Sequence, residues 1–282
     1  MVLGHEADHY TSYMEPTSTE ERILEGCLSS NQSVSRHPYL NHDGPVAFAH
    51  RGGNLEAPEN TLAAFEHAVS LGYRYLETDV HCSADGVLVA FHDSDLQRTC
   101  GTDANIADLC WTEIAELRVN DLEPIPRMID LLDRWPDHRF NIDCKSDEAV
   151  APLIKLVEQR GLIPQICVGA FSLKRLRTLR TRLGSGLLTS MAPAEIAALR
   201  LTGRLPGAQP RAAQVPTAAG RLTVINERFI ANAQRAGVPV HVWTINDAPE
   251  MHRLLDLGAD GVMTDDVAML RNVMIERNVW SG

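Results

Sequence analysis

The chain has 282 residues, of which 44% are hydrophobic and 22% are charged, and its formal net charge is −11. This composition is typical of a folded globular protein, and the length suits a single barrel domain. The acidic balance argues against a nucleic-acid partner, because binding to a duplex depends on Lys and Arg neutralising phosphates.

The expected elements alternate between strands and helices from residue 45 onward. Residues 1–40 lack sustained hydrophobic periodicity, and we expect a poorly ordered N-terminal extension there. Short apolar runs indicate strands at 46–50, 73–81, 86–92, 139–145, 165–171, 238–246 and 259–265. Amphipathic stretches indicate helices at 59–72, 125–135, 148–161, 172–184, 193–200, 226–237, 249–258 and 267–277. Residues 201–224, rich in Gly, Pro, Ala and Arg, are expected to form a loop.

This repetition of strand and helix requires a parallel sheet covered by helices. An open doubly wound sheet is one solution, but the number of units favours closure into a (β/α)8 barrel, the TIM-barrel fold. We therefore predict one α/β barrel domain over residues 41–282, following the N-terminal extension.

The cellular compartment is indicated by three features that the sequence lacks: paired cysteines, a signal peptide and a transmembrane stretch. Its six cysteines have no CxxC pair and no zinc-ligand spacing, so we expect reduced thiols. The N-terminal residues do not resemble a signal peptide, and no stretch approaches about 18 apolar residues. We expect a cytoplasmic protein without a transmembrane segment, for which peripheral membrane contact stays open.

Ionisable residues recur at the carboxyl ends of successive expected strands, which is where parallel barrels carry reactive side chains. In chain order they are His50 and Arg51, Glu77 and Asp79, His92, and Asp143 and Lys145. A lone histidine, a Glu-x-Asp pair or an Asp-x-Lys pair is more often structural. Their recurrence at the same kind of position indicates a shared site.

The acidic residues point to a metal ion. Side chains two apart on a strand share a face, so Glu77 and Asp79 converge, as do Asp143 and Lys145. Three carboxylates at one point repel one another, and a hard divalent cation such as Mg²⁺ or Ca²⁺, with Mn²⁺ a further candidate, is their natural partner. The lack of thiolate or multiple-histidine ligands disfavours zinc.

The basic residues point to phosphate. Arg51 and Lys145 place fixed positive charge beside the expected cation, a combination that binds phosphate oxygens. His50 and His92 can accept or donate protons near neutral pH. These residues together predict chemistry at a phosphoester.

Two further residues are candidates for supporting the site. Glu59 stands in the first turn of an expected helix, which Pro58 begins, and it can orient Arg51 or His50. His81 follows Val80 at the end of the same expected strand as the acidic pair, and we expect it to reach the pocket as a supporting residue. Four other histidines are not counted as site residues, and we expect them to be structural or exposed: His67, His138, His241 and His252.

The motifs that surround these residues resemble the glycerophosphodiester phosphodiesterase family, in particular its bacterial members. AHRGG and PENTLAAFEHAVSLG come first, followed by ETDVHCSADGVLVAFHD, VHVWTIND and LGADGVMTD. The resemblance covers residues 45–280 in the family's order. Each motif alone is a weak signal, but together they are specific.

The resemblance implies a metal-dependent barrel enzyme that cleaves small-molecule glycerophosphodiesters into glycerol 3-phosphate and an alcohol. His50 and His92 then correspond to the acid–base histidines, and Glu77 and Asp79 to metal ligands. The remaining correspondences are Arg51 and Lys145 near the phosphate and Trp243 beside the substrate. Asp143 departs from the family's usual Glu-x-Lys pattern, and its shorter side chain requires a closer backbone or a bridging water.

Three other functions remain open at this point. The first is the same chemistry on a larger lipid, as in a lysophospholipase D, which a hydrophobic rim on the loops would favour. The second is a barrel lyase or isomerase that holds a cation against an enolate, with Lys145 as base. The third is a metal-binding barrel without catalysis, to which the substitution at Asp143 gives slight support.

Overall fold

The computed structural model describes residues 1, 37–205, 207, 209–220 and 222–281. In these ranges eight parallel strands form a closed ring, because β1 pairs with β2 on one side and with β13 on the other. The predicted (β/α)8 barrel is therefore confirmed. In ring order the strands are β1 (Val46–Ala49), β2 (Tyr75–Cys82), β6 (Arg139–Cys144), β7 (Ile166–Gly169), β8 (Leu188–Ser190), β9 (Arg211–Val215), β12 (Val240–Val242) and β13 (Gly261–Thr264).

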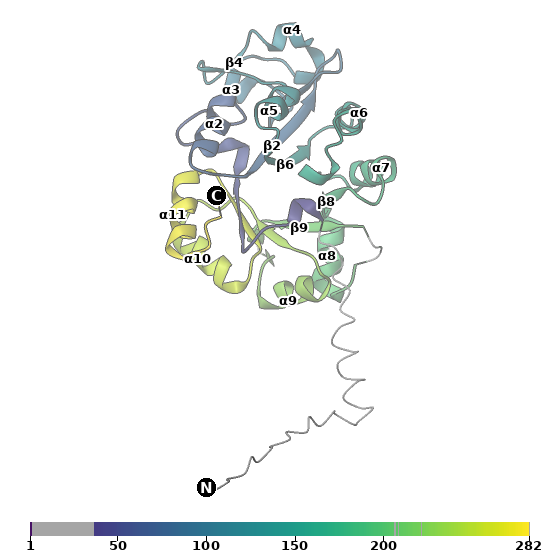
Figure 1. Cartoon of the computed structure of the whole chain (residues 1–282). Coiled ribbons are helices and arrows are strands. Elements are labelled where there is room, and N and C mark those ends of the chain that lie inside the picture. Colours follow the sequence, from purple (N-terminus) through teal and green to yellow (C-terminus); the bar gives the residue numbers. More distant parts are fainter. Residues whose placement is uncertain (2–36, 206, 208, 221, 282) are drawn as a thin grey trace. The chain divides into compact units, whose positions relative to one another are not determined.

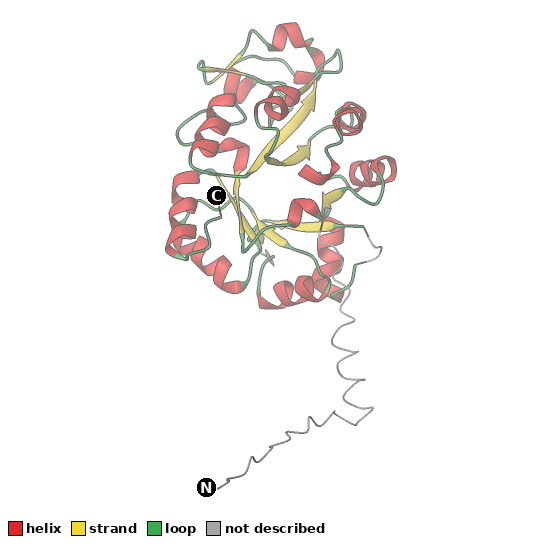
Figure 2. Ribbon diagram, viewed as in Figure 1, coloured by secondary structure: helices red, strands yellow, loops and turns green. Residues whose placement is uncertain are grey.

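A helix follows each barrel strand and lies on the outside of the ring (Figure 1, Figure 2). These helices are α2 (Leu62–Ser70), α5 (Met128–Arg134), α6 (Val150–Arg160), α7 (Leu173–Leu183), α8 (Pro193–Thr202), α9 (Glu227–Arg235), α10 (Ala248–Leu257) and α11 (Val267–Glu276). Several begin at side-chain caps: the Thr61 hydroxyl accepts a hydrogen bond from the Ala64 N–H at 3.3 Å.

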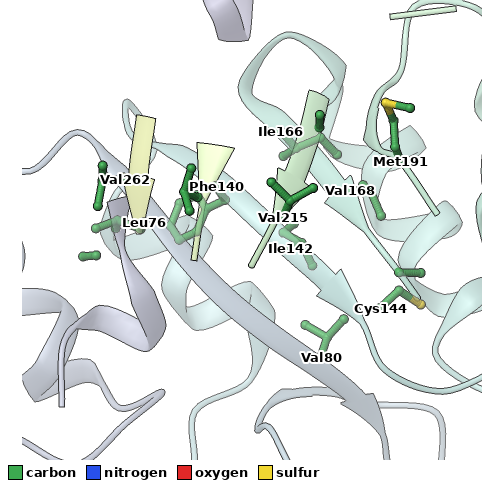
Figure 3. Packing of buried hydrophobic residues seen from close by; sticks show 14 of the residues in the cluster. Leu76, Val80, Phe140, Ile142, Cys144, Ile166, Val168, Met191, Val215 and Val262 are labelled. Atoms are coloured by element: carbon green, nitrogen blue, oxygen red, sulfur yellow. The ribbon is translucent and has the colours of Figure 1, made fainter. Parts of the chain in front are cut away.

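The main core fills the space between the strands and the helices. Leu76 and Val80 of β2 belong to it together with Phe140 and Ile142 of β6 (Figure 3). Because alternate residues of a strand face opposite sides, burial of Leu76 and Val80 outside the ring turns Glu77 and Asp79 toward the barrel interior. The hydrophobic pattern of β2 thus positions its two acidic side chains.

A second apolar cluster joins barrel-strand residues such as Phe48 and Tyr75 to Tyr39, which precedes the first strand. Tyr39 is fully buried in the short 3₁₀ helix Pro38–Leu40, and its carbonyl accepts a hydrogen bond from the Tyr75 hydroxyl at 2.7 Å. We expected the extension to run through residue 40, but residues 37–40 pack into the barrel. The rest of that expected extension, residues 2–36, lies outside the described residues.

The expected strand at 86–92 is present but does not belong to the ring. β3 (Leu88–Ala90) pairs antiparallel with β2, and it begins an inserted segment with its own apolar cluster, including Val89, Phe91 and Ile114. The other elements of this segment are α3 (Gln97–Cys100), the 3₁₀ helix Ile106–Asp108, α4 (Trp111–Ile114), β4 (Arg118–Val119) and β5 (Glu123–Pro124). His92 therefore lies on an insertion and not at the end of a barrel strand.

The prediction of a loop over 201–224 was wrong in its centre. Barrel strand β9 occupies Arg211–Val215, and a hairpin of β10 (Ala218–Ala219) and β11 (Leu222–Thr223) follows it. Ala212 and Ala213 are fully buried, but neither is β-branched or aromatic. Pairing with β8 and β12 holds the strand where its own propensity does not.

Candidate active site

A cavity of about 440 Å³ opens at the carboxyl ends of the barrel strands, and most of the predicted site residues line it. They are His50, Arg51, Glu77, Asp79, His92, Asp143, Lys145 and Trp243. Glu59 and His81 are the two predicted residues that do not. Side chains from four strands and from the inserted segment are thus brought to one place.

The turn after β1 is built so that His50 and Arg51 face this cavity. Arg51 adopts a left-handed conformation with φ 53°, and Gly52 and Gly53 follow with φ 83° and 86°. A Cβ on Gly52 would lie 2.8 Å from the backbone N of Phe65 in α2. The backbone N–H of Arg51 donates to Glu77 Oε2 at 3.0 Å, which joins the turn to β2.

His50 is held between two carboxylates. Its Nδ1 lies 2.7 Å from Asp265 Oδ1, directly after β13, and its Nε2 lies 3.9 Å from Glu77 Oε2. Burial by itself lowers the pKa of His50, but the Glu77 charge and the hydrogen bond to Asp265 outweigh it, and the net shift is upward. Because Asp265 accepts from Nδ1, Nε2 is left to exchange protons in the cavity.

The two acidic residues of β2 differ in their partners. Asp79 lies 2.9 Å from Lys145 Nζ and 3.3 Å from Arg51 Nε, and Asn60 Nδ2 donates to it at 3.0 Å. Burial by itself raises the pKa of Asp79, but the Lys145 and Arg51 charges lower it by more. The net shift of the pKa is therefore downward, and this carboxylate stays ionised. Glu77 has the opposite balance, because burial and then the Asp79 charge raise its pKa to about 7.

Asp143 and Lys145 complete the polar floor of the cavity. The parallel register places Asp143 directly beside Asp79, and the Lys145 ammonium bridges the pair, with its Nζ 2.8 Å from Asp143 Oδ2. Burial lowers the pKa of Lys145, but the two carboxylates raise it well above its usual range. Lys145 is therefore a fixed cation and unsuited to act as a neutral base, which disfavours the lyase interpretation.

The fit to a divalent cation can be judged from the carboxylates. In the described part of the chain, no three His, Cys, Asp or Glu side chains gather closely enough to hold a metal ion. The donor chemistry nevertheless suits a hard cation, because Glu77 and Asp79 offer oxygen ligands to the same cavity. Glu77 is buried beside Asp79, and burial and then the Asp79 charge disfavour its ionised form.

A chain of ion pairs links Arg51 to His92 through the inserted segment. Arg51 Nη1 donates to Glu59 Oε1 at 3.0 Å, and Arg98 Nη2 of α3 donates to the same oxygen at 2.6 Å. Arg98 Nε also donates to Asp93 Oδ2 at 2.5 Å, while Asp93 Oδ1 lies 2.6 Å from His92 Nδ1. Glu59 thus contacts Arg51 but does not contact His50.

The last two predicted residues lie at the margins of the site. The Trp243 indole lies at the cavity wall, edge-on to Phe171 with ring centroids 5.9 Å apart. His81 lies in a neighbouring hollow, where its Nε2 is 3.1 Å from the His92 carbonyl oxygen. His81 therefore supports the loop that carries His92.

Four residues that contact the site side chains were missed by sequence reasoning. Asp265 stands at the carboxyl end of an expected strand, so the rule that selected Glu77 would also have found it. Asp93 follows His92 directly. Asn60 and Arg98 carry no signal of their own, because their contacts depend on how α2 and α3 pack beside β2.

Comparison with known proteins agrees with this geometry. The model of the glycerophosphoryl diester phosphodiesterase family matches residues 50–269, which is most of the chain. The chain belongs to this family. It is 34% identical to "Probable glycerophosphodiester phosphodiesterase 2" of Mycobacterium tuberculosis over 254 residues, covering 86% of this chain and 96% of that protein.

Two further family members extend the comparison. Lysophospholipase D GDPD1 of Homo sapiens is 28% identical, with 89% of this chain and 95% of that protein covered. The crystal structure of the Thermotoga maritima glycerophosphodiester phosphodiesterase superposes with a TM-score of 0.68 at 26% identity, covering 82% of this chain and 99% of that one. This family membership identifies the chain as a phosphodiesterase. No helix in the described ranges is long and apolar enough to span a membrane.

Proposed function

We propose that this phosphodiesterase hydrolyses glycerophosphodiesters to glycerol 3-phosphate and an alcohol by acid–base catalysis at His50 and His92. The observation that carries the proposal is the matched arrangement of the two histidines. Each has its Nδ1 within hydrogen-bonding distance of an aspartate, Asp265 for His50 and Asp93 for His92. Each is thereby oriented with Nε2 available for proton transfer.

The proposed mechanism is an in-line displacement at phosphorus. One histidine removes a proton from the nucleophile, which is water or a neighbouring glycerol hydroxyl, and the other protonates the departing alcohol. Arg51 and Lys145 hold the non-bridging oxygens and stabilise the charge that develops on them. Asp79 keeps both cations in place through its contacts with Arg51 Nε and Lys145 Nζ.

A divalent cation, Mg²⁺, Ca²⁺ or Mn²⁺, is part of this proposal. Glu77 and Asp79 would hold it, with Asp143 as a third ligand, and it would supply further positive charge to the phosphoryl group. The convergence of Glu77, Asp79 and Asp143 on one cavity supports a cation at this place. We also propose a cytoplasmic location, in agreement with the acidic balance and the free thiols of Cys82, Cys100, Cys110, Cys144 and Cys167.

The test is release of glycerol 3-phosphate from a panel of glycerophosphodiesters, with EDTA and with each of the three cations. We expect release that EDTA abolishes, and His50→Ala should lower the rate by about 10² to 10⁴-fold. His67→Ala is the control, since His67 lies on α2 outside the cavity. Near-normal hydrolysis by His50→Ala would exclude the acid–base role.

Two further measurements, of metal binding and of activity on carbon acids, separate the remaining alternatives. Metal binding without turnover of any diester would favour a barrel that has lost catalysis. An activity on an enolisable carbon acid without diester hydrolysis would favour the lyase or isomerase.

A further inference from the structure

The hollow that contains His81 shares a wall with the cavity. It has a volume of about 480 Å³ and lies between the inserted segment, the loop after β6 and the first turn of α7. Lys145 lines the hollow as well as the cavity. His92 is linked to both, because it lines the cavity and its carbonyl oxygen accepts a hydrogen bond from His81 in the hollow. A phosphodiester held at Lys145 and His92 therefore lies next to the hollow.

The positive charges that line this hollow are neutralised within the protein. Lys145 Nζ lies 2.9 Å from Asp79 Oδ1 and 2.8 Å from Asp143 Oδ2, two carboxylates that belong to the cavity. Arg175 Nε lies 2.7 Å from Asp147 Oδ1, and Arg175 Nη1 donates to a backbone carbonyl oxygen at 3.0 Å. An anionic ligand would therefore find no unpaired ammonium or guanidinium group among the described residues of the hollow.

Two carboxylates of the hollow have no cation of their own. Asp108 comes from the inserted segment, where it accepts a hydrogen bond from Asn105 Nδ2 at 2.7 Å, and Glu148 directly precedes the start of α6. Both are exposed, and neither forms an ion pair with a Lys, Arg or His side chain of the described residues. The hollow therefore presents negative charge to solvent, and a cationic group is the partner that it lacks.

His81 points to the same ligand independently of the carboxylates. The residue is 7% exposed, and its Nε2 lies 3.1 Å from the His92 carbonyl oxygen. Because a carbonyl oxygen only accepts, Nε2 donates, and in the neutral ring Nδ1 is then an acceptor. Nδ1 has no hydrogen-bond partner among the described residues and is not sealed in the interior, so it faces the hollow that His81 lines. A ligand that donates a hydrogen bond would satisfy this nitrogen.

We propose that this hollow binds the ammonium group of the departing alcohol, and that the enzyme prefers a primary amino alcohol, such as ethanolamine, as the headgroup. This inference rests on the proposed function, because the phosphodiester must lie at Lys145 for its headgroup to enter the hollow. The charge of the ammonium group matches Asp108 and Glu148, and its N–H groups match His81 Nδ1. A choline headgroup carries the charge without an N–H donor, and a glycerol headgroup carries donors without the charge.

The first experiment compares kcat/KM for glycerophosphoethanolamine, glycerophosphocholine and glycerophosphoglycerol at low ionic strength. Glycerophosphoethanolamine should lead, by about two- to fivefold over glycerophosphoglycerol for each exposed carboxylate that the ammonium group meets. Glycerophosphocholine should fall between them. Because these charges are exposed, salt at about 1 M should shrink the lead. Equal values for the three diesters, or a lead for choline or glycerol, would overturn the proposal.

The second experiment removes the two charges with little change of shape. Asp108→Asn and Glu148→Gln should each lower the ratio of kcat/KM for glycerophosphoethanolamine to that for glycerophosphoglycerol by about two- to fivefold, and the double variant should lower it further. Asp103→Asn and Glu158→Gln are the matched controls, since both are exposed carboxylates of the same two segments that line neither the hollow nor the cavity. An unchanged ratio in the double variant would contradict the proposal.

The third experiment tests the hydrogen bond to His81. His81→Phe removes the acceptor, and it should lower the ratio of kcat/KM for glycerophosphoethanolamine to that for glycerophosphocholine by about two- to tenfold. Loss of the bond to the His92 carbonyl oxygen affects both substrates alike, so the ratio isolates Nδ1. An unchanged ratio would contradict the assignment of Nδ1 to the ammonium group.

A binding measurement separates failure of this inference from failure of the proposed function. Calorimetric titration into His50→Ala should show tighter binding of glycerophosphoethanolamine than of glycerophosphoglycerol. Such an order without release of glycerol 3-phosphate by the unchanged protein would uphold the hollow and reject the reaction. Release from all three diesters at equal rates, with equal binding, would uphold the reaction and reject the hollow.

Discussion

At the scale of the residue, Arg98 is the side chain that links Arg51, after β1, to His92 on the inserted segment. It contacts Glu59, which contacts Arg51, and it contacts Asp93, which contacts His92. Its own side chain is 49% exposed, and exposed ion pairs add only about 0–1 kcal/mol to stability. We therefore propose that Arg98 acts by holding the orientation of Arg51 and His92.

We predict that Arg98→Leu lowers kcat about 10- to 100-fold with a smaller effect on KM, and that Arg98→Lys recovers part of the loss. Arg134→Leu is the control, because it breaks an exposed ion pair with Glu66 that lies apart from the cavity. Steady-state kinetics and urea unfolding of the three variants test this. If the free energy of unfolding of Arg98→Leu fell far enough to account for its lower activity, the role of Arg98 would be merely structural.

His241 is a second residue whose environment has a measurable consequence. It is fully buried on β12 beside Phe48, and neither ring nitrogen has a hydrogen-bond partner among the described residues. Burial, and then the charge of His42, lower the pKa of His241 to about 3. The unfolded chain, with a histidine pKa near ~6.5, binds the proton more readily.

The sign of the pH effect follows from this difference. Between about pH 3 and 6.5 the unfolded state binds more protons, so stability rises with pH in that window and is fully present above it. We predict that the wild-type protein loses about 2 kcal/mol more than His241→Leu when the pH falls from about 7 to 5. Urea unfolding at the two pH values measures it, and equal losses would contradict the prediction.

At the scale of the element, the turn after β1 depends on glycine for two separate reasons. Gly52 has a positive φ, and a Cβ there would also overlap the backbone of α2, 2.8 Å from Phe65 N and 2.9 Å from Ala64 C. Gly86, in the turn between β2 and β3, has a similar φ of 85°, but a Cβ at that position would meet no atom within 4 Å. The two positions therefore separate backbone strain from steric overlap.

We predict that Gly86→Ala costs about 1–2 kcal/mol of stability from the left-handed backbone alone. Gly52→Ala should cost at least about 1–3 kcal/mol more, because it adds overlap with α2. It should also reduce activity by moving His50 and Arg51. Denaturant unfolding of both variants tests the comparison, and equal costs would mean that α2 yields without strain.

At the scale of the whole molecule, a bound cation should stabilise the fold, because the folded chain brings Asp143 of β6 to Glu77 and Asp79 of β2 and the unfolded chain does not. At a concentration of one hundred times Kd, a ligand adds about 2.7 kcal/mol. We predict a rise in Tm with Mg²⁺, Ca²⁺ or Mn²⁺ that Glu77→Gln reduces. Glu66→Gln, on the exposed face of α2, is the control. An unchanged Tm with all three ions would argue against the metal site.

Much of the fold could be predicted because its signals are local. The apolar runs of β1, β2 and β6 alternate with capped, amphipathic helices, and each pattern reports on its own element. β9 could not be predicted in this way, because Ala212 and Ala213 become a strand only through pairing with β8 and β12. The antiparallel course of β3 was missed for a similar reason, since direction is set by pairing and not by composition.

The sequence by itself determined which side chains share a face. The spacing of two in Glu77–Thr78–Asp79 and in Asp143–Cys144–Lys145 turns each pair toward the same side, whatever the neighbouring strands do. Only the tertiary structure decided the partners of these groups. Asp265 meets His50 across 215 positions of the chain, and Asp79 shares Lys145 with Asp143 because β2 and β6 pair in that register. These partners are long-range contacts, made by the pairing of β2 with β6 and by the pairing of β1 with β13 that closes the barrel.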